Sequence, residues 1–295
     1  MSEPEHHDTV VIAVDGSPES DAAVRFGTRE ATLRAVPIVL LNVVSHYITS
    51  RSIGPAPLEP AYSGWQQDNA RDALARAENI VRASAGQLPV PEMRSEVVYS
   101  AVVPALAEAS KHAAMVVVGC RGRGAIGRLA LGSTSTGLIH HGHGPIALVR
   151  ADDAQAPDDV APVLVGIDGS RASVAATALA FDEASRRGVD LIALHAWSDL
   201  SYSPYAIADQ SYEAQGHEIL AERLAGWHDR YPDVTVHRQI VTDRPAHWLI
   251  DGSQQAQLVV VGSHGRGGYI GMLLGSVSTA VVHAAHCPVI VVRPR

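Results

Sequence analysis

The sequence predicts an α/β protein with two tandem, doubly wound domains, each built on a five-stranded parallel sheet with helices on both faces. Three observations support this fold class. The 295 residues are enough for about two domains. Short motifs of the first half recur in the second half, and in each half Val- and Ile-rich runs alternate with helical patterns. Such alternation is typical of parallel strands joined by helices.

The internal repeat covers most of the chain. Val11–Ser17 recurs as Leu164–Ser170, and Val116–Gly119 recurs as Val259–Gly262. Solenoid units run over only about 20–50 residues, so each copy is interpreted as a whole domain. The first copy is ten residues longer, and the excess lies in 47–62, which is interpreted either as a lid beside a ligand site or as an ordinary surface loop.

The domain boundaries follow from the repeat. We expect a first domain over 1–150, of which 1–8 is flexible, and a second domain over 162–295. Residues 151–161 are acidic and poor in apolar side chains, which is typical of an exposed linker.

Local patterns predict the elements of the first copy in order. Ser17 followed by Pro18 is typical of a helix start, because Ser caps the helix and Pro fits its first turn. The run Met115–Val118 is apolar on both faces, as in a central strand covered by helices on both sides. Strands are expected over 9–15, 37–45, 92–100, 114–119 and 145–150, and helices from Pro18 and over 65–85, 103–112 and 133–141.

The second copy repeats this order. Strands are expected over 163–168, 189–196, 234–241, 257–262 and 288–293, and helices over 170–187, 208–230, 245–253 and 276–285. The last strand of each copy is short, apolar and expected at a sheet edge, where unpaired backbone groups favour further pairing. The two edges are expected to pair within one chain as an internal pseudo-dimer, and a homodimer of whole chains would use other surfaces.

Composition excludes several classes of protein. Hydrophobic residues make up 46% and charged residues 18%, which favours a packed core over a disordered or fibrous chain. The formal net charge of −8 disfavours a nucleic-acid-binding surface. No apolar run is long enough to span a membrane, the N-terminus lacks the pattern of a signal peptide, and two Cys cannot form a disulfide framework. A cytoplasmic protein is therefore expected.

A glycine-spaced motif follows the fourth expected strand of both copies. It reads G-x2-G-x9-G-S from Gly119 and again from Gly262. Glycines let the backbone approach a ligand, successive N–H groups bind anions, and the final Gly-Ser opens a helix whose N-terminus favours phosphate. Asp15 and Asp168 close the first strands at the sheet edge where such folds bind ligands. A tight turn with a Ser N-cap is the alternative, but the same unusual spacing in both copies favours an anion site.

Further donors surround this motif. Hydroxyl groups are offered by Ser133, Thr134, Ser135, Ser276 and Ser278. Arg123 and Arg266 occupy corresponding positions and are expected to reach the same anion. A Glu in place of Gly119 or Gly262 is therefore expected to remove bound phosphate while the fold is retained.

Two other glycine-rich patterns are weaker signals. Gly122–Gly127 matches G-x-G-x-x-G, but it follows the fourth strand and the second copy does not keep it. Residues 127–134 resemble a P-loop without its Lys. The single Lys of the chain, Lys111, precedes the fourth strand, so phosphate binding with slow or no hydrolysis is expected.

The His and Cys residues also have competing interpretations. His140 and His143 have the i, i+3 spacing of metal ligands, as do His283 and His286, but His also suits a helix C-terminus, and a metal site is not expected. Cys120 lies in the glycine loop, where a redox role is an alternative, although Ser stands there in the second copy.

The Asp-Gly-Ser after the first strand and the repeated glycine motif resemble the universal stress protein family, in its nucleotide-binding type. The resemblance covers about residues 9–150 and 161–293, and the layout resembles the two-domain stress proteins of mycobacteria and related actinobacteria. It implies strand order 3-2-1-4-5 and ATP binding, with the Asp near adenine and ribose and the glycine loop on the phosphates. It also implies that strand five pairs across a dimer interface.

The resemblance implies one ATP site in each copy, with Mg²⁺ left open as an accompanying ion. In the first copy the implied contacts are Ala13, Asp15, Val43, Val44, Gly119, Cys120, Gly122, Arg123, Gly124, Gly132, Ser133, Thr134 and Ser135. In the second copy they are Gly166, Asp168, His195, Trp197, Gly262, Ser263, Gly265, Arg266, Gly267, Gly268, Gly275, Ser276, Val277 and Ser278. Ala13 stands where the second copy has Gly166, and Thr134 where it has Val277, so the two sites are expected to differ in affinity.

The resemblance implies a stress-response regulator or sensor that acts through nucleotide occupancy, and not an enzyme beyond weak ATP hydrolysis. Two alternatives stay open. One is a slow ATPase or nucleotidyl-transfer enzyme of the same fold, and the other is a nucleotide-independent interaction scaffold. The nucleotide retained on purification discriminates among the three, and the downstream protein partner is left open.

Overall fold

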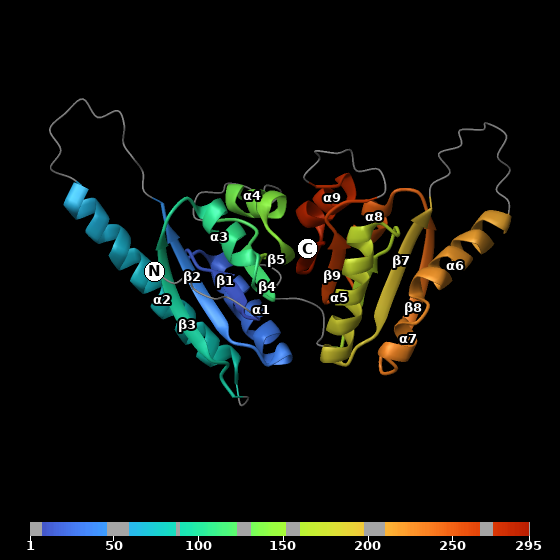
Figure 1. Ribbon diagram of the computed structural model, residues 1–295, viewed down its shortest axis with the longest axis horizontal. Helices are drawn as coiled ribbons and strands as arrows, with labels where there is room; N and C mark the ends of the chain where they lie inside the picture. Colours follow the sequence, from blue (N-terminus) through green and yellow to red (C-terminus); the bar gives the residue numbers. More distant parts are fainter. Residues whose placement is uncertain are drawn as a thin grey trace, which may run out of the picture. The chain divides into compact units, whose positions relative to one another are not determined.

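The computed structural model describes residues 8–45, 59–86, 89–122, 131–151, 160–197, 210–265 and 274–294. It divides into two compact units, Met1–Ala154 and Gln155–Arg295, whose elements are labelled in Figure 1. Most of the segment expected to be flexible and most of the expected linker lie outside the described residues. The same holds for 47–58 of the stretch interpreted as a lid or an ordinary surface loop, whereas residues 59–62 belong to a helix.

The first unit contains a parallel sheet of order β3-β2-β1-β4-β5. Its strands are β1 (Val10–Ala13), β2 (Ile38–Val44), β3 (Met93–Tyr99), β4 (Met115–Gly119) and β5 (Gly144–Val149). Ile12 of β1 pairs with Leu40 of β2 and with Val117 of β4, and all three side chains are fully buried. Central strands covered on both faces bury their side chains in this way. The expected fold class and the strand order 3-2-1-4-5 are confirmed.

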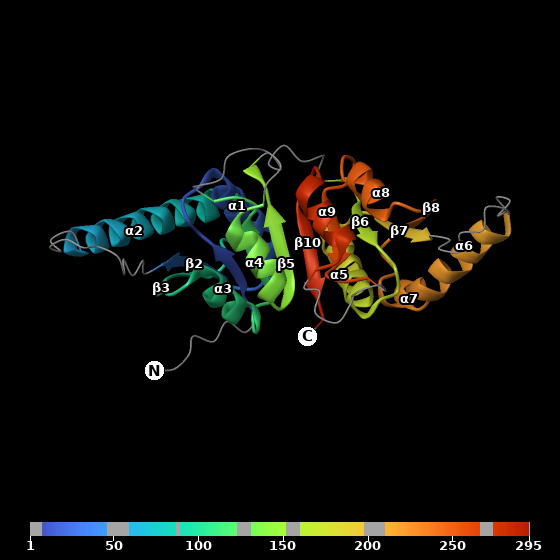
Figure 2. The same cartoon turned by 90° about the horizontal axis from the view of Figure 1, so that it is seen from above.

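Four helices cover this sheet. They are α1 (Pro18–Arg34), α2 (Glu59–Ser84), α3 (Val102–Ser110) and α4 (Ser133–His141). Helices α1 and α2 contact each other on one face, and α3 and α4 contact each other on the other face (Figure 2). Right-handed crossovers produce this arrangement when the strand order reverses next to β1. The carboxyl ends of β1 and β4 therefore flank the switch point of the sheet.

The second unit repeats this architecture with strand order β8-β7-β6-β9-β10, again parallel. Its strands are β6 (Val163–Gly166), β7 (Leu191–Trp197), β8 (Val236–Thr242), β9 (Leu258–Gly262) and β10 (Val289–Arg293). Its helices are α5 (Arg171–Arg187), α6 (Gln210–Leu224), α7 (Trp227–Arg230), α8 (Pro245–Gly252) and α9 (Ser276–Ala284). Figure 2 shows α5 and α6 on one face of this sheet and α8 and α9 on the other.

Several element boundaries differ from the sequence-based expectation, and three of them bear on the fold or the site. The single helix expected over 208–230 is divided into α6 and α7, because Gly226 adopts φ 78°, a left-handed conformation that ends a helix. Helix α2 begins at Glu59, six residues before the expected start. Strand β1 ends at Ala13 and β6 ends at Gly166, so Asp15 and Asp168 do not close these strands but lie in the turns after them.

In the part of the chain that the structure describes, no helix combines the length and the apolar character needed to cross a membrane.

Candidate functional site

The turn after β1 holds the Asp15 carboxylate in one orientation. The backbone N–H of Ser17 donates to Asp15 Oδ1 over 2.9 Å, and the backbone N–H of Asp15 donates to Ser20 Oγ over 3.2 Å. Gly16 has φ 77°, which favours glycine over any residue with a β-carbon. Ser17 is also the N-cap of α1, accepting from the backbone N–H of Ser20 over 3.1 Å. One short turn thus starts α1 and positions the acid.

The second unit repeats this turn bond for bond. Asp168 Oδ1 accepts from the backbone N–H of Ser170 over 2.8 Å, and the backbone N–H of Asp168 donates to Ser173 Oγ over 3.1 Å. Gly169 has φ 78°. The two acids are therefore presented by the same local geometry.

Helix α1 itself is fastened to α2. Arg76 of α2 donates from Nε to both carboxylate oxygens of Asp21 over 3.0 Å. This bond to Asp21 raises the pKa of Arg76 above its usual value. The helix that carries the acid turn is thereby anchored to the next helix.

The first glycine of each motif packs against a helix. A β-carbon on Gly119 would lie 2.9 Å from the carbonyl carbon of Glu19 on α1, and one on Gly262 would lie 2.8 Å from that of Ala172 on α5. Backbone cannot move aside as a flexible side chain can. The glycine permits close approach of the helix to the strand, so we now expect Glu at position 119 or 262 to destabilise its domain as well as to remove bound phosphate.

The second glycine of each motif faces the acid. A β-carbon on Gly122 would lie 2.9 Å from Asp15 Oδ2, and one on Gly265 would lie 2.6 Å from Asp168 Oδ2. The loop backbone therefore runs directly past the Oδ2 atom of each carboxylate. This contact joins the two halves of the predicted site in both units.

The third glycine begins the next helix. Gly132 and Gly275 are the N-caps of α4 and α9, and no described side chain caps either helix. The alternative of a Ser N-cap is therefore wrong for both motifs. The first-turn N–H groups of a helix that lacks a side-chain cap are available to an anion.

The third residue of each helix uses its hydroxyl to shape the loop. Ser135 Oγ donates to the carbonyl oxygens of Gly119 and Cys120 over 2.8 and 3.1 Å. Ser278 Oγ donates to Ser263 O over 3.1 Å and to Gly275 O over 3.0 Å. Both Ser side chains are buried. In this structure they stabilise the loop from behind, and the other hydroxyl donors at the helix start of the first unit are the exposed Ser133 and the half-buried Thr134.

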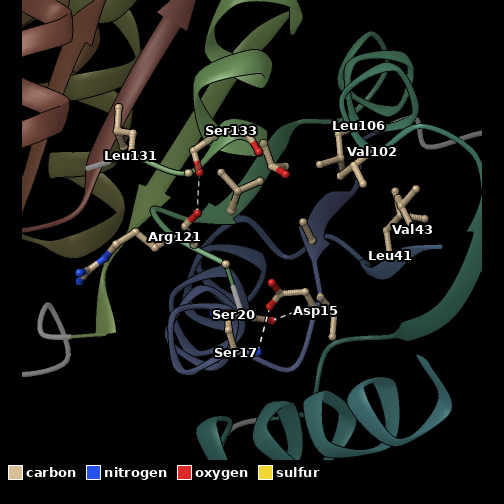
Figure 3. A pocket seen from close by; sticks show the side chains of 18 residues that line it. Asp15, Ser17, Ser20, Leu41, Val43, Val102, Leu106, Arg121, Leu131 and Ser133 are labelled. Atoms are coloured by element: carbon tan, nitrogen blue, oxygen red, sulfur yellow. Dashed lines mark hydrogen bonds between the residues drawn. The ribbon is translucent and has the colours of Figure 1, made fainter. Parts of the chain in front are cut away.

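A cavity of about 550 Å³ connects these parts in the first unit. That volume lies within the range of about 300–1,000 Å³ found for small-molecule sites. Figure 3 shows that its two ends differ: Leu41, Val43, Val102 and Leu106 gather on one side, whereas Ser133 and Arg121 lie on the other. Asp15, Ser17 and Ser20 lie between the two ends. The cavity therefore suits an elongated ligand with one apolar and one anionic end.

The cavity unites most of the residues predicted for the first site. Its lining includes Ala13, Asp15, Val43, Gly119, Gly122, Gly132, Ser133, Thr134 and Ser135. Of the other predicted residues, Val44 and Cys120 are buried outside this lining, and Arg123 and Gly124 lie outside the described residues. Val44 points to the opposite face from Val43 because side chains alternate along a strand. In the second unit, Arg266, Gly267 and Gly268 lie outside the described residues.

Sequence reasoning missed the apolar end of the cavity. Leu41 precedes Val43 by two residues and shares its strand face, so the strand period could have identified it. Val102 and Leu106 are one helical turn apart at the start of α3, after the carboxyl end of β3. Arg121 occupies a variable position of the motif and carries no sequence signal of its own.

His195 lies behind the second acid rather than in an open position. Its side chain is buried, and its Nδ1 lies 2.6 Å from the carbonyl oxygen of Ile167, the residue before Asp168. Because a carbonyl oxygen only accepts, Nδ1 carries the proton and donates. Asn42 holds the corresponding place in the first unit, where its Nδ2 donates to Val14 O over 2.7 Å. His195 and Asn42 thus each bind the carbonyl group of the residue that precedes the acid in their own domain.

Two residues named by the resemblance, Val44 and Trp197, use their carbonyl groups within each sheet. The carbonyl oxygen of Val44 accepts from the backbone N–H of Ser100 over 3.2 Å, and that of Trp197 accepts from Asp243 over 2.8 Å. These carbonyl groups connect β2 to β3 and β7 to β8.

The paired His residues do not share a helical face. Helix α4 ends at His141, before His143, and α9 ends at Ala284, before His286. His140 and His283 lie in the last turns, where His complements the helix dipole. Among the described residues, no group of three or more His, Cys, Asp or Glu is placed to hold a metal ion.

Comparison with known proteins gives one consistent result. The family model described as "Universal stress protein family" matches residues 6–150 and again 160–293. A universal stress protein of Mycolicibacterium smegmatis is 50% identical over 287 residues, covering 97% of each chain. One from Mycobacterium tuberculosis (strain ATCC 25618 / H37Rv) is 50% identical over 295 residues, covering 99% of each chain. The crystal structure of a universal stress protein from Archaeoglobus fulgidus has the same fold, with a TM-score of 0.70, 18% identity and 99% coverage of both chains.

Proposed function

Because the chain belongs to the universal stress protein family and contains two tandem domains of it, we propose that each domain binds one ATP molecule. Occupancy of the two sites, and not turnover, is the output that a stress response would read. The observation that carries this proposal is the two-ended cavity of the first unit, with Asp15 between an apolar end and a helix N-terminus.

The lining of the cavity supports this proposal for each part of the nucleotide. Leu41, Val43 and Leu106 offer an apolar surface for the base. Asp15 Oδ2 lies at the loop and would accept hydrogen bonds from ribose hydroxyl groups. The N-terminus of α4, whose N-cap is Gly132, would hold the phosphates through backbone N–H groups and the helix dipole.

The second domain supports the same assignment through its repeated geometry. Asp168 faces Gly265 as Asp15 faces Gly122. Helix α9 begins at Gly275 without a side-chain cap from the described residues, as α4 does. We therefore propose two nucleotides for each chain.

The position of the single Lys supports binding with at most slow hydrolysis. The single Lys of the chain, Lys111, lies at the C-terminal end of α3, and its Nζ donates to Glu108 Oε2 over 2.6 Å. This hydrogen bond lowers the pKa of Glu108. Lys111 thus follows the C-terminal end of α3, whereas Val102 and Leu106, which line the cavity, lie in the first and second turns of that helix. Phosphoryl transfer ordinarily uses a Lys or Arg clamp, Mg²⁺ and an oriented nucleophile.

Asp15 is the carboxylate of the cavity lining and would be the protein ligand of any Mg²⁺ bound with ATP.

Nucleotide content and stoichiometry test this proposal. The full-length chain is purified, one portion is denatured, and the released nucleotide is identified by ion-exchange chromatography. A second, nucleotide-free portion is titrated with ATP by calorimetry. ATP in the released fraction and two sites in the titration support the proposal. ADP alone favours a slow ATPase, and absence of binding in both measurements favours an interaction scaffold.

A further inference from the structure

An ion pair lies beside the first site, and the second domain has neither an Arg nor a Glu at the corresponding positions. Arg121 Nη2 lies 3.3 Å from Glu19 Oε1, and the two side chains are only 15% and 14% exposed. Glu19 lies in the first turn of α1, directly beside Gly119. The corresponding residues of the second unit are Ala172 and His264. The glycine loops of the two domains are thus joined to their first helices by different chemistry.

Arg121 belongs to the phosphate end of the cavity. It is a lining residue, and its Cα lies 3.4 Å from the position of a β-carbon on Gly132, the N-cap of α4. Figure 3 shows its guanidinium group turned away from Asp15 and Ser133. Glu19 of α1 forms an ion pair with this guanidinium group. The Arg121 guanidinium group at the phosphate end is therefore held by the Glu19 carboxylate of α1.

The second domain ties its loop to the helix without a carboxylate. Ser170, the N-cap of α5, donates from Oγ to the carbonyl oxygen of His264 over 2.9 Å. His264 Nδ1 lies 3.0 Å from Ser263 Oγ. The residue aligned with Glu19 is Ala172, which has no charge to offer. Nothing at position 172 competes with a ligand for the side chain at position 264.

We propose that Glu19 and the phosphate groups of a bound nucleotide compete for the Arg121 guanidinium. Glu19 is then a specificity-determining residue that sets the preference of the first site for nucleoside triphosphates over monophosphates. This inference rests on the proposed function of the cavity. Guanidinium groups form their strongest hydrogen bonds with carboxylate or phosphate, so both partners suit the same cation. Because the pair is mostly shielded from solvent, it is screened less than an exposed pair.

Competition has a consequence that depends on the length of the phosphate chain. A triphosphate extends further along the loop and carries more negative charge than a monophosphate, so it gains more from a released Arg121. Neutralising Glu19 should therefore tighten ATP binding more than AMP binding. A purely structural role of the ion pair would change both affinities alike.

The test uses the full-length chain and measures ATP and AMP affinities by calorimetry. Variants are compared in a Gly265→Val background, which is designed to silence the second site. We expect Glu19→Gln to tighten ATP binding about 3- to 10-fold and AMP binding by less than about 2-fold. The double variant Glu19→Gln with Arg121→Gln should lose this gain. Ala172→Gln, the matched substitution in the second domain, should leave the ratio at the first site unchanged.

A transplant into the second domain gives an independent measurement should Glu19→Gln fail to fold. In a Gly122→Val background, His264→Arg should raise the preference of the second site for ATP over AMP. Adding Ala172→Glu should reverse that gain. An unchanged ratio in Glu19→Gln, or a gain that persists without Arg121, would overturn the competition while leaving nucleotide binding intact. Failure of the unmodified chain to bind any nucleotide would overturn the proposed function and this inference together.

Discussion

Replacing Gly122 with Val tests whether the contact between loop and acid is part of a binding site. The β-carbon of the new side chain would lie 2.9 Å from Asp15 Oδ2, closer than such atoms pack. Either the carboxylate must rotate or the loop must shift. Because Asp15 Oδ1 is held by the backbone N–H of Ser17 over 2.9 Å, rotation breaks that hydrogen bond.

The size of the effect follows from this bond. Hydrogen bonds to a charged group contribute about 1.5–3 kcal/mol. If the acid must keep its orientation to bind ribose, the affinity of the first site should fall about 10- to 100-fold. The methyl groups of Val would also enter the cavity next to Asp15. Gly265→Val should act in the same way on the second site, where the β-carbon would lie 2.6 Å from Asp168 Oδ2.

Calorimetric titration with ATP is the assay. The unmodified chain should bind two nucleotides, each single variant one, and the double variant none within the same concentration range. Gly64→Val is the matched control, since a β-carbon on Gly64 meets no described atom within 4 Å. Circular dichroism and thermal unfolding verify that each variant is folded. Two undiminished sites in a folded Gly122→Val chain would refute the reasoning that places the nucleotide between the acid and the loop.

Three further outcomes are expected. Gly119→Ala should destabilise the first domain by about 1–3 kcal/mol in thermal unfolding, because its β-carbon meets the backbone of α1, whereas Gly64→Ala should not; equal stability of the two variants would contradict the packing role. His195→Leu should weaken ATP binding at the second site and reduce stability by about 1–3 kcal/mol, because a buried carbonyl loses its donor. His195→Asn should largely restore both ATP affinity and stability, because Asn42 donates to the corresponding carbonyl group in the first domain. A His195→Asn chain that is as impaired as His195→Leu would contradict this shared role. Chains of residues 1–150 and 158–295, expressed separately and studied by analytical ultracentrifugation, should self-associate and form a one-to-one complex on mixing if strand five is the pairing edge; two monomers that ignore each other would exclude that model.

The sequence alone determined the fold class, the tandem repeat and the position of the glycine-spaced loop. These features depend on local patterns that one chain records directly. Strands such as β4 are apolar on both faces, as central parallel strands must be. Asp-Gly-Ser contains a residue for a positive φ followed by a helix cap, and the repeated glycine spacing marks a helix start near the switch point.

Local patterns did not predict the break after α6 or the role of each glycine. Residues 208–230 have a helical pattern throughout, and only the backbone shows that Gly226 is left-handed. Gly119 and Gly122 look alike in the sequence, yet one packs on the backbone of α1 and the other faces Asp15. The difference arises from which element lies opposite each glycine, and that element is distant in the chain.

Tertiary structure decided the chemistry at the two ends of the cavity. Leu41 and Leu106 come from separate elements, and only packing brings them together into an apolar end. Glu19 and Arg121 are about a hundred residues apart, so no spacing rule connects them before the helix and the loop are placed side by side. Ion pairs, cavity volumes and hydrogen bonds between such elements depend on distances in space. Those distances are set by the fold and cannot be derived from the order of residues along the chain.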